Sequence, residues 1–382
     1  MQKPKTVRLI TYPMNKNNYR YIPELDVIRG IAILMVFFYH TQLSIFPPYE
    51  IRNYTDSGIL DLRSTKDLIF NFLPFTFGEL GVELFLVISG FVIHLGFLNS
   101  QDRFNVKQFY VRRFFRIYPP YLLVLLFFIV FRNMSFSPKD ILLHILLIHN
   151  LSDASFFSIN PSFWTLALEV QLYLAYPLFL YFRKKIGIRN TVAGLTLLHF
   201  ACTFILETFM KDSIPLPMAL SMPVLWFTWG AGALAAELYW ENKKIFKQKP
   251  LLYLLVFLVL LPVCKYFMVA HYFTIAVSVC AWLALLEWFL YKKQEDPFFL
   301  KPLFRVLAGI GVCSYSLYLI HQPYLFDLLK HLGHFKFIMV HLVASPLAAL
   351  FIFTIIAYGL YQFVELPSVE LGKRLWKKYG NP

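Results

Sequence analysis

Charge is scarce in this 382-residue chain. Aspartate, glutamate, lysine and arginine together make up 15% of it, whereas 58% of the residues are hydrophobic and 19% are aromatic. Soluble domains usually contain about 25% charged residues, so this composition excludes an ordinary soluble domain. The apolar residues also occur in long runs rather than in amphipathic stripes. The composition therefore predicts a multi-pass membrane protein.

Cysteine is equally sparse, and internal repeats, low-complexity tracts and Gly/Ser linkers are missing. The four cysteines lie in or beside apolar runs without a C-x-x-C spacing, and they are Cys202, Cys264, Cys280 and Cys313. Neither a disulfide framework nor a zinc site is indicated. The longest segments between apolar runs, 47–79 and 133–162, are too short to build a core of their own. Any chemistry must therefore use residues of the apolar helices.

Runs of about 20 apolar residues are long enough to cross a bilayer as helices. Ten runs predict an all-α fold, a polytopic membrane protein with about ten transmembrane helices in one bundle. They are residues 28–46, 80–98, 117–132, 163–182, 190–210, 218–239, 251–269, 271–291, 303–326 and 338–364. We expect a cytoplasmic N-terminal segment over 1–27, a transmembrane domain over 28–364 and a cytoplasmic C-terminal tail over 365–382.

Acidic residues are outnumbered 22 to 36 by lysine and arginine, which gives a net charge of +14. Alternate connections divide the basic residues unevenly, and one side receives 27 of the 36. That side comprises the N-terminus through Arg29, the segments 99–116, 183–189, 241–250 and 292–305, and the C-terminal tail. Positive-inside bias therefore predicts that both termini are cytoplasmic. Because the basic residues border helix ends instead of forming one patch, nucleic-acid binding is not expected.

Four titratable side chains are placed by residue count in the outer half of the membrane: His40, Glu83, Glu169 and His321. They belong to four different predicted helices. Ionisable residues within a bilayer are costly and usually functional, so we expect them to converge on one cavity. The alternative is that they form interhelical hydrogen bonds that only hold the bundle together.

Arginines cluster at the opposite boundary. Arg113 and Arg116, with Arg112 beside them, precede the third apolar run at helical spacing. Guanidinium groups hold phosphate oxygens bidentately, which favours a phosphate site. Topology signalling or contact with lipid headgroups is the alternative. Arg29 lies eleven residues before His40, almost three helical turns, so the two share a helix face about 16 Å apart.

Three other histidines are weaker candidates for a functional site. His94 lies nearer the inner half of its apolar run and is interpreted as a packing or snorkelling residue. His144 and His149 lie in the outer segment, five residues apart. That spacing is poor for a shared helix face, so no metal site is expected there.

Five blocks of the sequence resemble those of the membrane-bound acyltransferase family 3, bacterial O-acyltransferases that modify surface polysaccharides and other exported glycans. They appear in the family's order: ELDVIRGIAILMVFFYH (24–40), GVELFLVISGFVI (81–93), YVRRFFRIYPPYL (110–122), SFWTLALEVQLYLAYPL (162–178) and YSLYLIHQP (315–323). The most specific feature is R-G-x-A with a histidine ten residues after the glycine, followed by R-x-x-R and W-x-L-x-x-E.

The resemblance implies specific roles. His40 and Arg29 would be essential, Arg113 and Arg116 would bind the acyl-CoA donor, and Glu169 is favoured as a site carboxylate. The esterase-like SGNH domain that many relatives carry after the bundle has no counterpart in these residues, which leaves the choice of acceptor open.

Together, the residues and the resemblance predict an enzyme of the inner (plasma) membrane. It would move an acyl group, with acetyl-CoA as the expected donor, to a hydroxyl of a glycan or lipid-linked sugar, without a tightly bound cofactor or a metal. His40 would act as general base or as acyl carrier, with Glu169 or Glu83 orienting its imidazole. The alternatives are a transporter or flippase of a lipid-linked sugar and a noncatalytic scaffold or sensor.

Overall fold

The computed structural model describes residues 21–45, 74–100, 103–132, 134–210, 214–247, 249–266, 273–291, 300–332 and 344–380. Throughout these ranges the regular structure is helical, and no strand occurs in them. The predicted all-α class is therefore confirmed. Most of the expected outer segment 47–79 and the first twenty residues lie outside the described ranges.

The helices follow one another with short connections. The first half contains α1 (Pro23–Ile45), η1 (Pro74–Leu80), α4 (Gly81–Asn99), α5 (Val106–Phe131), α6 (Pro138–Ile145), η2 (His149–Leu151), η3 (Asp153–Ser155), α7 (Trp164–Ile186) and α8 (Ile188–Phe209). The second half contains α9 (Leu216–Ala219), α10 (Met222–Trp240), α11 (Pro250–Tyr266), α12 (Thr274–Tyr291), α13 (Leu300–Val312), α14 (Ser314–Leu332), α15 (Ser345–Leu360), the π-helical turn η6 (Tyr361–Glu365) and α16 (Leu366–Tyr379).

Each of the ten expected spans overlaps a helix, but fewer helices qualify as spans. Within the described residues, seven are long and apolar enough to cross a membrane, or eight if α13 and α14 are one broken span. These two helices meet at an angle of 75°, and α13 is amphipathic. The expected span 251–269 falls on α11, whose apolar part Pro250–Cys264 is shorter than the other spans.

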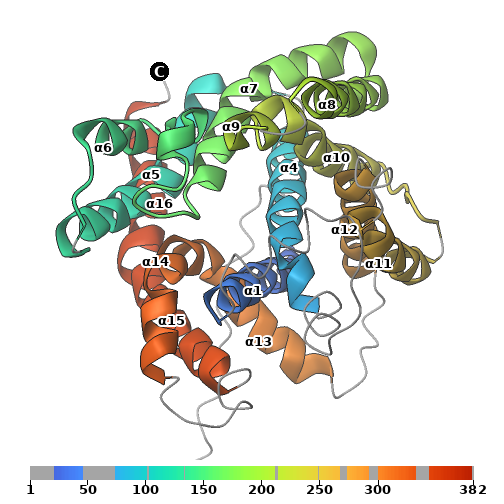
Figure 1. Cartoon of the computed structure of the whole chain (residues 1–382). Helices are drawn as coiled ribbons and strands as arrows, with labels where there is room; N and C mark the ends of the chain where they lie inside the picture. Colours follow the sequence, from blue (N-terminus) through green and yellow to red (C-terminus); the bar gives the residue numbers. More distant parts are fainter. Residues whose placement is uncertain are drawn as a thin grey trace, which may run out of the picture.

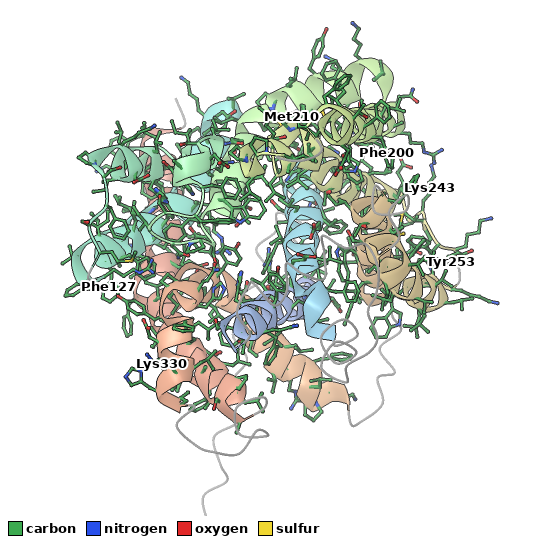
Figure 2. All side chains as sticks on the ribbon, viewed as in Figure 1. Phe127, Phe200, Met210, Lys243, Tyr253 and Lys330 are labelled. Atoms are coloured by element: carbon green, nitrogen blue, oxygen red, sulfur yellow. The ribbon has the colours of Figure 1, made fainter. Side chains whose placement is uncertain are left out.

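The outer surface of the bundle is apolar. Leu197 and Phe204 on α8 are 72% and 62% exposed, Val259 on α11 is 70% exposed and Phe351 on α15 is 67% exposed. Figure 2 shows the same arrangement at the labelled Phe127, whose side chain lies at the edge of the molecule. Exposed apolar faces of this extent are unfavourable in water and are typical of contact with lipid.

Helix α4 lies at the centre of the molecule, with α10 and α12 on one side and α5 and α14 on the other (Figure 1). Glycines allow α4 and α10 to pack backbone against backbone. A Cβ atom on Gly90 would lie 1.9 Å from the Trp229 carbonyl oxygen, and one on Gly232 would lie 2.0 Å from that of Val87. Small residues at such crossings are the usual device of close helix packing in membranes.

The same device fixes α1, the helix that contains two predicted site residues. A Cβ atom on Gly30 would lie 2.1 Å from the carbonyl oxygen of Leu307 on α13, and one on Gly311 would lie 1.8 Å from that of Asp26. The α1–α13 contact therefore sets how far α1 can shift or rotate. It thereby fixes the directions of Arg29 and His40.

The described residues of the expected C-terminal tail are largely helical. α15, η6 and α16 form one continuous helical stretch over Ser345–Tyr379. α16 packs along α5, where Ser368 Oγ donates a hydrogen bond of 2.6 Å to the carbonyl oxygen of Phe115. A hydrogen bond between the two helices keeps the π-helical turn η6 beside the arginines of α5.

Candidate active site

A cavity lies inside the bundle among α1, α4, α5, α7 and α14. It encloses about 890 Å³ of space not filled by atoms, counted to its open mouth. Four predicted site residues line this central cavity together with apolar side chains: Arg29, Arg113, Arg116 and Glu169. The structure thus brings the three arginines and one carboxylate together from three helices that are far apart in the sequence.

A second space, the basic vestibule, adjoins the central cavity. It encloses about 1160 Å³ and shares Arg29 and Arg113 with the cavity wall. Arg103 and Arg112 add two further positive charges. The aromatic lining residues are Tyr21, Phe97, Phe104, Phe109 and Tyr176. The two spaces form one path that begins among basic residues and ends at Glu169.

Arg113 differs from Arg29, although both border the two spaces. Nη1 of Arg29 lies 2.9 Å from a carboxylate oxygen of Asp26 on the same helix. The guanidinium of Arg113 lies instead over the rings of Phe109 and Tyr173, 5.6 and 5.5 Å from their centroids. Within the described part of the chain its Nε is buried without a hydrogen-bond partner. Arg113 therefore lacks the carboxylate partner that Arg29 has among the described residues.

Arg116 is paired with a carboxylate that the sequence did not reveal. Its Nη1 lies 2.7 Å from Oε1 of Glu365, which is fully buried on the π-helical turn η6. Ser316 Oγ donates a hydrogen bond of 2.7 Å to the other carboxylate oxygen, Oε2 of Glu365. The available signal was an acidic residue immediately after the last apolar run, and it was assigned to the tail. Glu365 balances the charge of Arg116 at the cavity wall.

Glu169 faces the cavity, but among the described residues it is not bonded to a histidine. Its Oε1 accepts hydrogen bonds from Ser89 Oγ at 3.1 Å and from the hydroxyl of Tyr173 one helical turn away. Trp229 Nε1 donates to Ser89 at 3.3 Å. These bonds fix Glu169 between α4, α7 and α10.

His40 is paired with His321. Nδ1 of His40 lies 2.8 Å from Nε2 of His321, and the two ring centroids are 5.0 Å apart. His321 is fully buried on α14, and its Nδ1 lies 2.9 Å from the carbonyl oxygen of Tyr318. Tyr318 itself lines the central cavity. The histidine pair therefore meets the cavity at Tyr318.

The structure corrects the expected convergence of four outer groups on one cavity. Of the four, only Glu169 is among the described residues that line the central cavity, and His40, Glu83 and His321 are not. Glu83 lies in the first turn of α4, and the partner that orients the imidazole of His40 is His321 rather than Glu169. Residue counting fixes depth along each helix, but it does not fix the direction in which a side chain leaves the helix.

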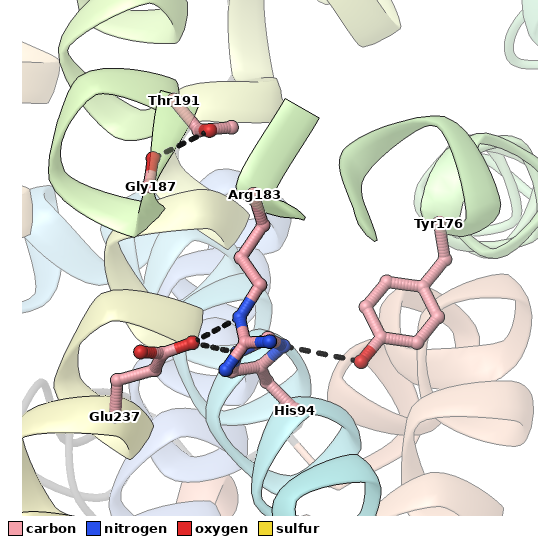
Figure 3. Close-up of polar contacts among 6 residues, drawn as sticks. All are labelled: His94, Tyr176, Arg183, Gly187, Thr191 and Glu237. Carbon is pink, nitrogen blue, oxygen red and sulfur yellow. Dashed lines mark hydrogen bonds and ion pairs between the residues drawn. The ribbon is translucent and has the colours of Figure 1, made fainter. Parts of the chain in front are cut away.

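His94 is not a snorkelling residue. It is fully buried, with Nε2 2.9 Å from Oε1 of Glu237 and Nδ1 3.1 Å from the hydroxyl of Tyr176. Arg183 Nε donates to the same carboxylate oxygen at 2.6 Å (Figure 3). This cluster joins α4, α7 and α10, and Tyr176 also lines the basic vestibule. His94 therefore holds helices together, as expected of a packing residue, but it does so through hydrogen bonds rather than apolar contacts.

His144 and His149 come together despite their spacing. Helix α6 ends at Ile145 and Leu147 has a positive φ of 54°, so the chain turns and the two rings stack with centroids 3.8 Å apart. Both are fully buried outside the membrane-spanning helices. Burial lowers the pKa of each imidazole, to about 3 for His149, which also faces His144.

Residues 22–362 match the profile of a protein family described as an acyltransferase domain. The chain belongs to this family and is a membrane-bound O-acyltransferase, so the predictions of family and enzyme class are confirmed. Membership does not support the alternatives of a transporter and a noncatalytic scaffold. Comparison with solved structures finds no match.

The similar proteins differ in how much of the chain they share. A protein of Acidianus two-tailed virus, named provisionally as an acetyltransferase, is 27% identical over 83% of this chain and 86% of its own length. The peptidoglycan O-acetyltransferase OatA of Listeria monocytogenes is 26% identical over 42% of this chain. The matched part makes up 24% of the Listeria protein.

Proposed function

We propose that this enzyme transfers an acetyl group from cytoplasmic acetyl-CoA to a hydroxyl of an exported or surface glycan at the inner (plasma) membrane. The observation that supports it most directly is the path from the basic vestibule into the central cavity, with the unpaired Nε of Arg113 where the two spaces meet. A transporter would give this arginine no particular task.

The vestibule suits the nucleotide end of a coenzyme A thioester. Its diphosphate and ribose phosphate are anions, and Arg103, Arg112 and Arg113 supply guanidinium groups that hold phosphate oxygens bidentately. The pantetheine arm is long and narrow, and the path continues past the apolar side chains of Val92 and Ile93. The thioester end would then reach the cavity near Tyr318.

His40 suits proton transfer or acyl transfer beside the cavity, where His321 connects it to Tyr318 of the cavity wall. As a general base it would remove the proton of the acceptor hydroxyl while the oxygen attacks the thioester carbonyl carbon. The C–O bond forms, the C–S bond breaks, and the coenzyme A thiolate takes the proton back from the imidazolium. As an acyl carrier it would first form an acyl-imidazole with release of coenzyme A, and the hydroxyl would then displace the imidazole.

A glycan acceptor is suggested by the name of the Listeria relative, a peptidoglycan O-acetyltransferase. His40 lies toward the end of α1 that leads to the expected outer segment, whereas the arginines of α5 belong to the expected inner boundary. Donor and acceptor would thus enter from opposite faces of the membrane, and the acetyl group would cross during the reaction.

The test uses purified protein in lipid vesicles of known orientation. Radiolabelled acetyl-CoA is supplied only on the side that bears the termini, and a peptidoglycan oligosaccharide is confined to the other side. We expect release of coenzyme A together with labelled oligosaccharide. Product formed only when both substrates share the terminus side would overturn the crossing. Absence of acetyl-CoA turnover with every acceptor would overturn the proposed donor.

A further inference from the structure

The hydrogen bonds around the histidine pair have a direction. A carbonyl oxygen only accepts, so the 2.9 Å contact between Nδ1 of His321 and the oxygen of Tyr318 places the proton of His321 on Nδ1. His321 is fully buried among apolar side chains, including Phe37, whose ring centroid is 6.1 Å away. An imidazolium there would be strongly disfavoured by burial, so His321 is neutral and its Nε2 has a lone pair.

That lone pair determines the tautomer of His40. Nε2 of His321 accepts the 2.8 Å hydrogen bond, so Nδ1 of His40 must donate it. In a neutral imidazole only one nitrogen bears a proton, which leaves Nε2 of His40 unprotonated. Within the described part of the chain, this Nε2 makes no hydrogen bond, and the side chain of His40 is only half-buried. The free lone pair is therefore open to a substrate.

We propose that His321 is a positioning residue that holds His40 in the tautomer whose Nε2 reacts with substrate. This inference rests on the proposed function of His40. When Nε2 of His40 takes the hydroxyl proton, its Nδ1–H becomes the donor of a charge-assisted hydrogen bond to Nε2 of His321. The neutral His321 thus stabilises the imidazolium without a carboxylate, and its negative charge, at the position next to Nδ1 of His40.

A series of hydrogen bonds also connects the histidine pair to the central cavity. It runs from the carbonyl oxygen of Tyr318 through His321 to His40. Tyr318 lines the central cavity, and its hydroxyl is fixed by Thr165 Oγ1 at 2.7 Å. Its backbone is held within α14, so the carbonyl that orients His321 cannot turn away. The same residue therefore forms part of the wall near the thioester and sets the proton arrangement of the base.

Two substitutions separate positioning from packing. His321→Leu removes the acceptor for Nδ1–H of His40, and we expect kcat to fall about 100-fold, as when a group that orients a histidine is removed. The KM for acetyl-CoA should change less than twofold, because the arginines are untouched. His321→Gln offers an amide oxygen as acceptor and should recover at least about 10-fold of the lost kcat.

His199 provides a matched control. It is also a buried histidine whose Nδ1 lies 2.8 Å from a backbone carbonyl, that of Val224, but it lies on α8 and faces Phe227. His199→Leu and His199→Gln should leave kcat unchanged. If His321→Leu had the kcat of wild type while His40→Ala was inactive, this inference would be wrong and the proposed function would stand. If His40→Ala retained activity, the proposed function itself would fail.

A second measurement is made on the wild-type ring itself and needs no substitution of His321. Nitrogen-15 NMR of wild-type protein labelled on histidine, with the His40 signals assigned by their loss in His40→Asn, reports which ring nitrogen bears the proton. We expect a protonated Nδ1 and an unprotonated Nε2 at neutral pH. The opposite tautomer, or an equal mixture of both, would overturn the inference.

Discussion

Arg116 and Glu365 form an ion pair of 2.7 Å between α5 and the π-helical turn η6, whereas Arg113, three residues earlier, has no carboxylate partner among the described residues. The two arginines of one R-x-x-R motif therefore have different environments. Arg116 is held by a carboxylate, and Arg113 is the arginine that we propose binds the donor. This difference separates an effect on stability from an effect on donor binding.

Replacing Arg113 by alanine should weaken acetyl-CoA binding. A charge-assisted hydrogen bond contributes about 1.5–3 kcal/mol, which corresponds to roughly a 10- to 150-fold rise in Kd. Lysine at position 113 should restore only part of the lost affinity, because its ammonium lacks the planar, paired N–H donors of a guanidinium group. Isothermal titration of detergent-solubilised protein measures Kd, and Arg189→Ala, an exposed arginine at the start of α8, is the control. If wild type and Arg113→Ala bound acetyl-CoA with equal affinity, Arg113 would not bind the donor, and its role would be that of a topology signal.

Replacing Glu365 by alanine should destabilise the bundle, because Arg116 would keep its charge without a partner. Loss of one member of a buried pair costs about 3–5 kcal/mol, but Arg116 is 37% exposed to the cavity, so we expect roughly 1–3 kcal/mol. Thermal unfolding followed by tryptophan fluorescence measures the shift. The double variant Arg116→Gln/Glu365→Gln, which removes both charges, should recover part of the stability lost in Glu365→Ala.

The control for this pair is Glu370→Ala, which removes a 3.7 Å contact to Arg374 that is open to solvent. No measurable shift is expected from it. A Glu365→Ala protein as stable as Glu370→Ala would mean that the buried carboxylate does not hold Arg116.

Replacing His40 by alanine should abolish transfer and leave donor binding intact. General acid–base catalysis by a positioned group contributes about 10²- to 10⁴-fold, so kcat should fall by at least about 100-fold. The Kd for acetyl-CoA should remain within twofold, since Arg113 lies elsewhere. Expression level and elution volume report folding. Near wild-type kcat in a well-folded His40→Ala protein would remove the central role of this residue.

The stacked pair His144–His149 predicts acid sensitivity outside the membrane. In the unfolded segment each imidazole takes up a proton as pH falls through 6.5, whereas burial keeps the folded pKa lower, about 3 for His149. Stability is therefore present above pH 6.5 and is lost as pH falls toward the folded value. His149 alone contributes about 1.4 kcal/mol per pH unit in that window.

Amide hydrogen exchange over residues 134–163 measures this loss. We expect protection at pH 5 to be lower than at pH 7 after correction for the intrinsic exchange rate. The double variant His144→Phe/His149→Phe keeps two stacked rings without the titration, and its protection should not depend on pH. A wild-type segment equally protected at both values would contradict the prediction.

The uneven distribution of basic residues predicts the orientation of the chain. Both termini should be cytoplasmic, and the segments 47–79 and 133–162 should lie on the opposite face. Single cysteines at Ser57, which lies outside the described residues, and at Ser152 can be labelled with a membrane-impermeant maleimide in intact cells, in a background without the native cysteines. Labelling at neither position would refute this topology.

The sequence by itself determined the class of the protein and the positions of its helices. The apolar runs exceed what a soluble core can bury, and each of the ten overlaps helical structure because a backbone in lipid must satisfy its hydrogen bonds within the segment. The run 303–326 is divided between α13 and α14. The same local information placed Arg113 and Arg116 at a helix boundary and His40 within a helix. Motif spacing was sufficient to indicate the acyltransferase family.

Only the tertiary structure decided which side chains are partners. His321 lies 281 positions after His40, and Glu365 belongs to a segment that the sequence assigned to a tail. Spacing along one helix gives depth, but the rotation of that helix and the identity of its neighbour depend on long-range packing, such as the contact of Gly30 with Leu307 on α13. The direction of each polar side chain follows from that packing, so His321 rather than Glu169 orients His40.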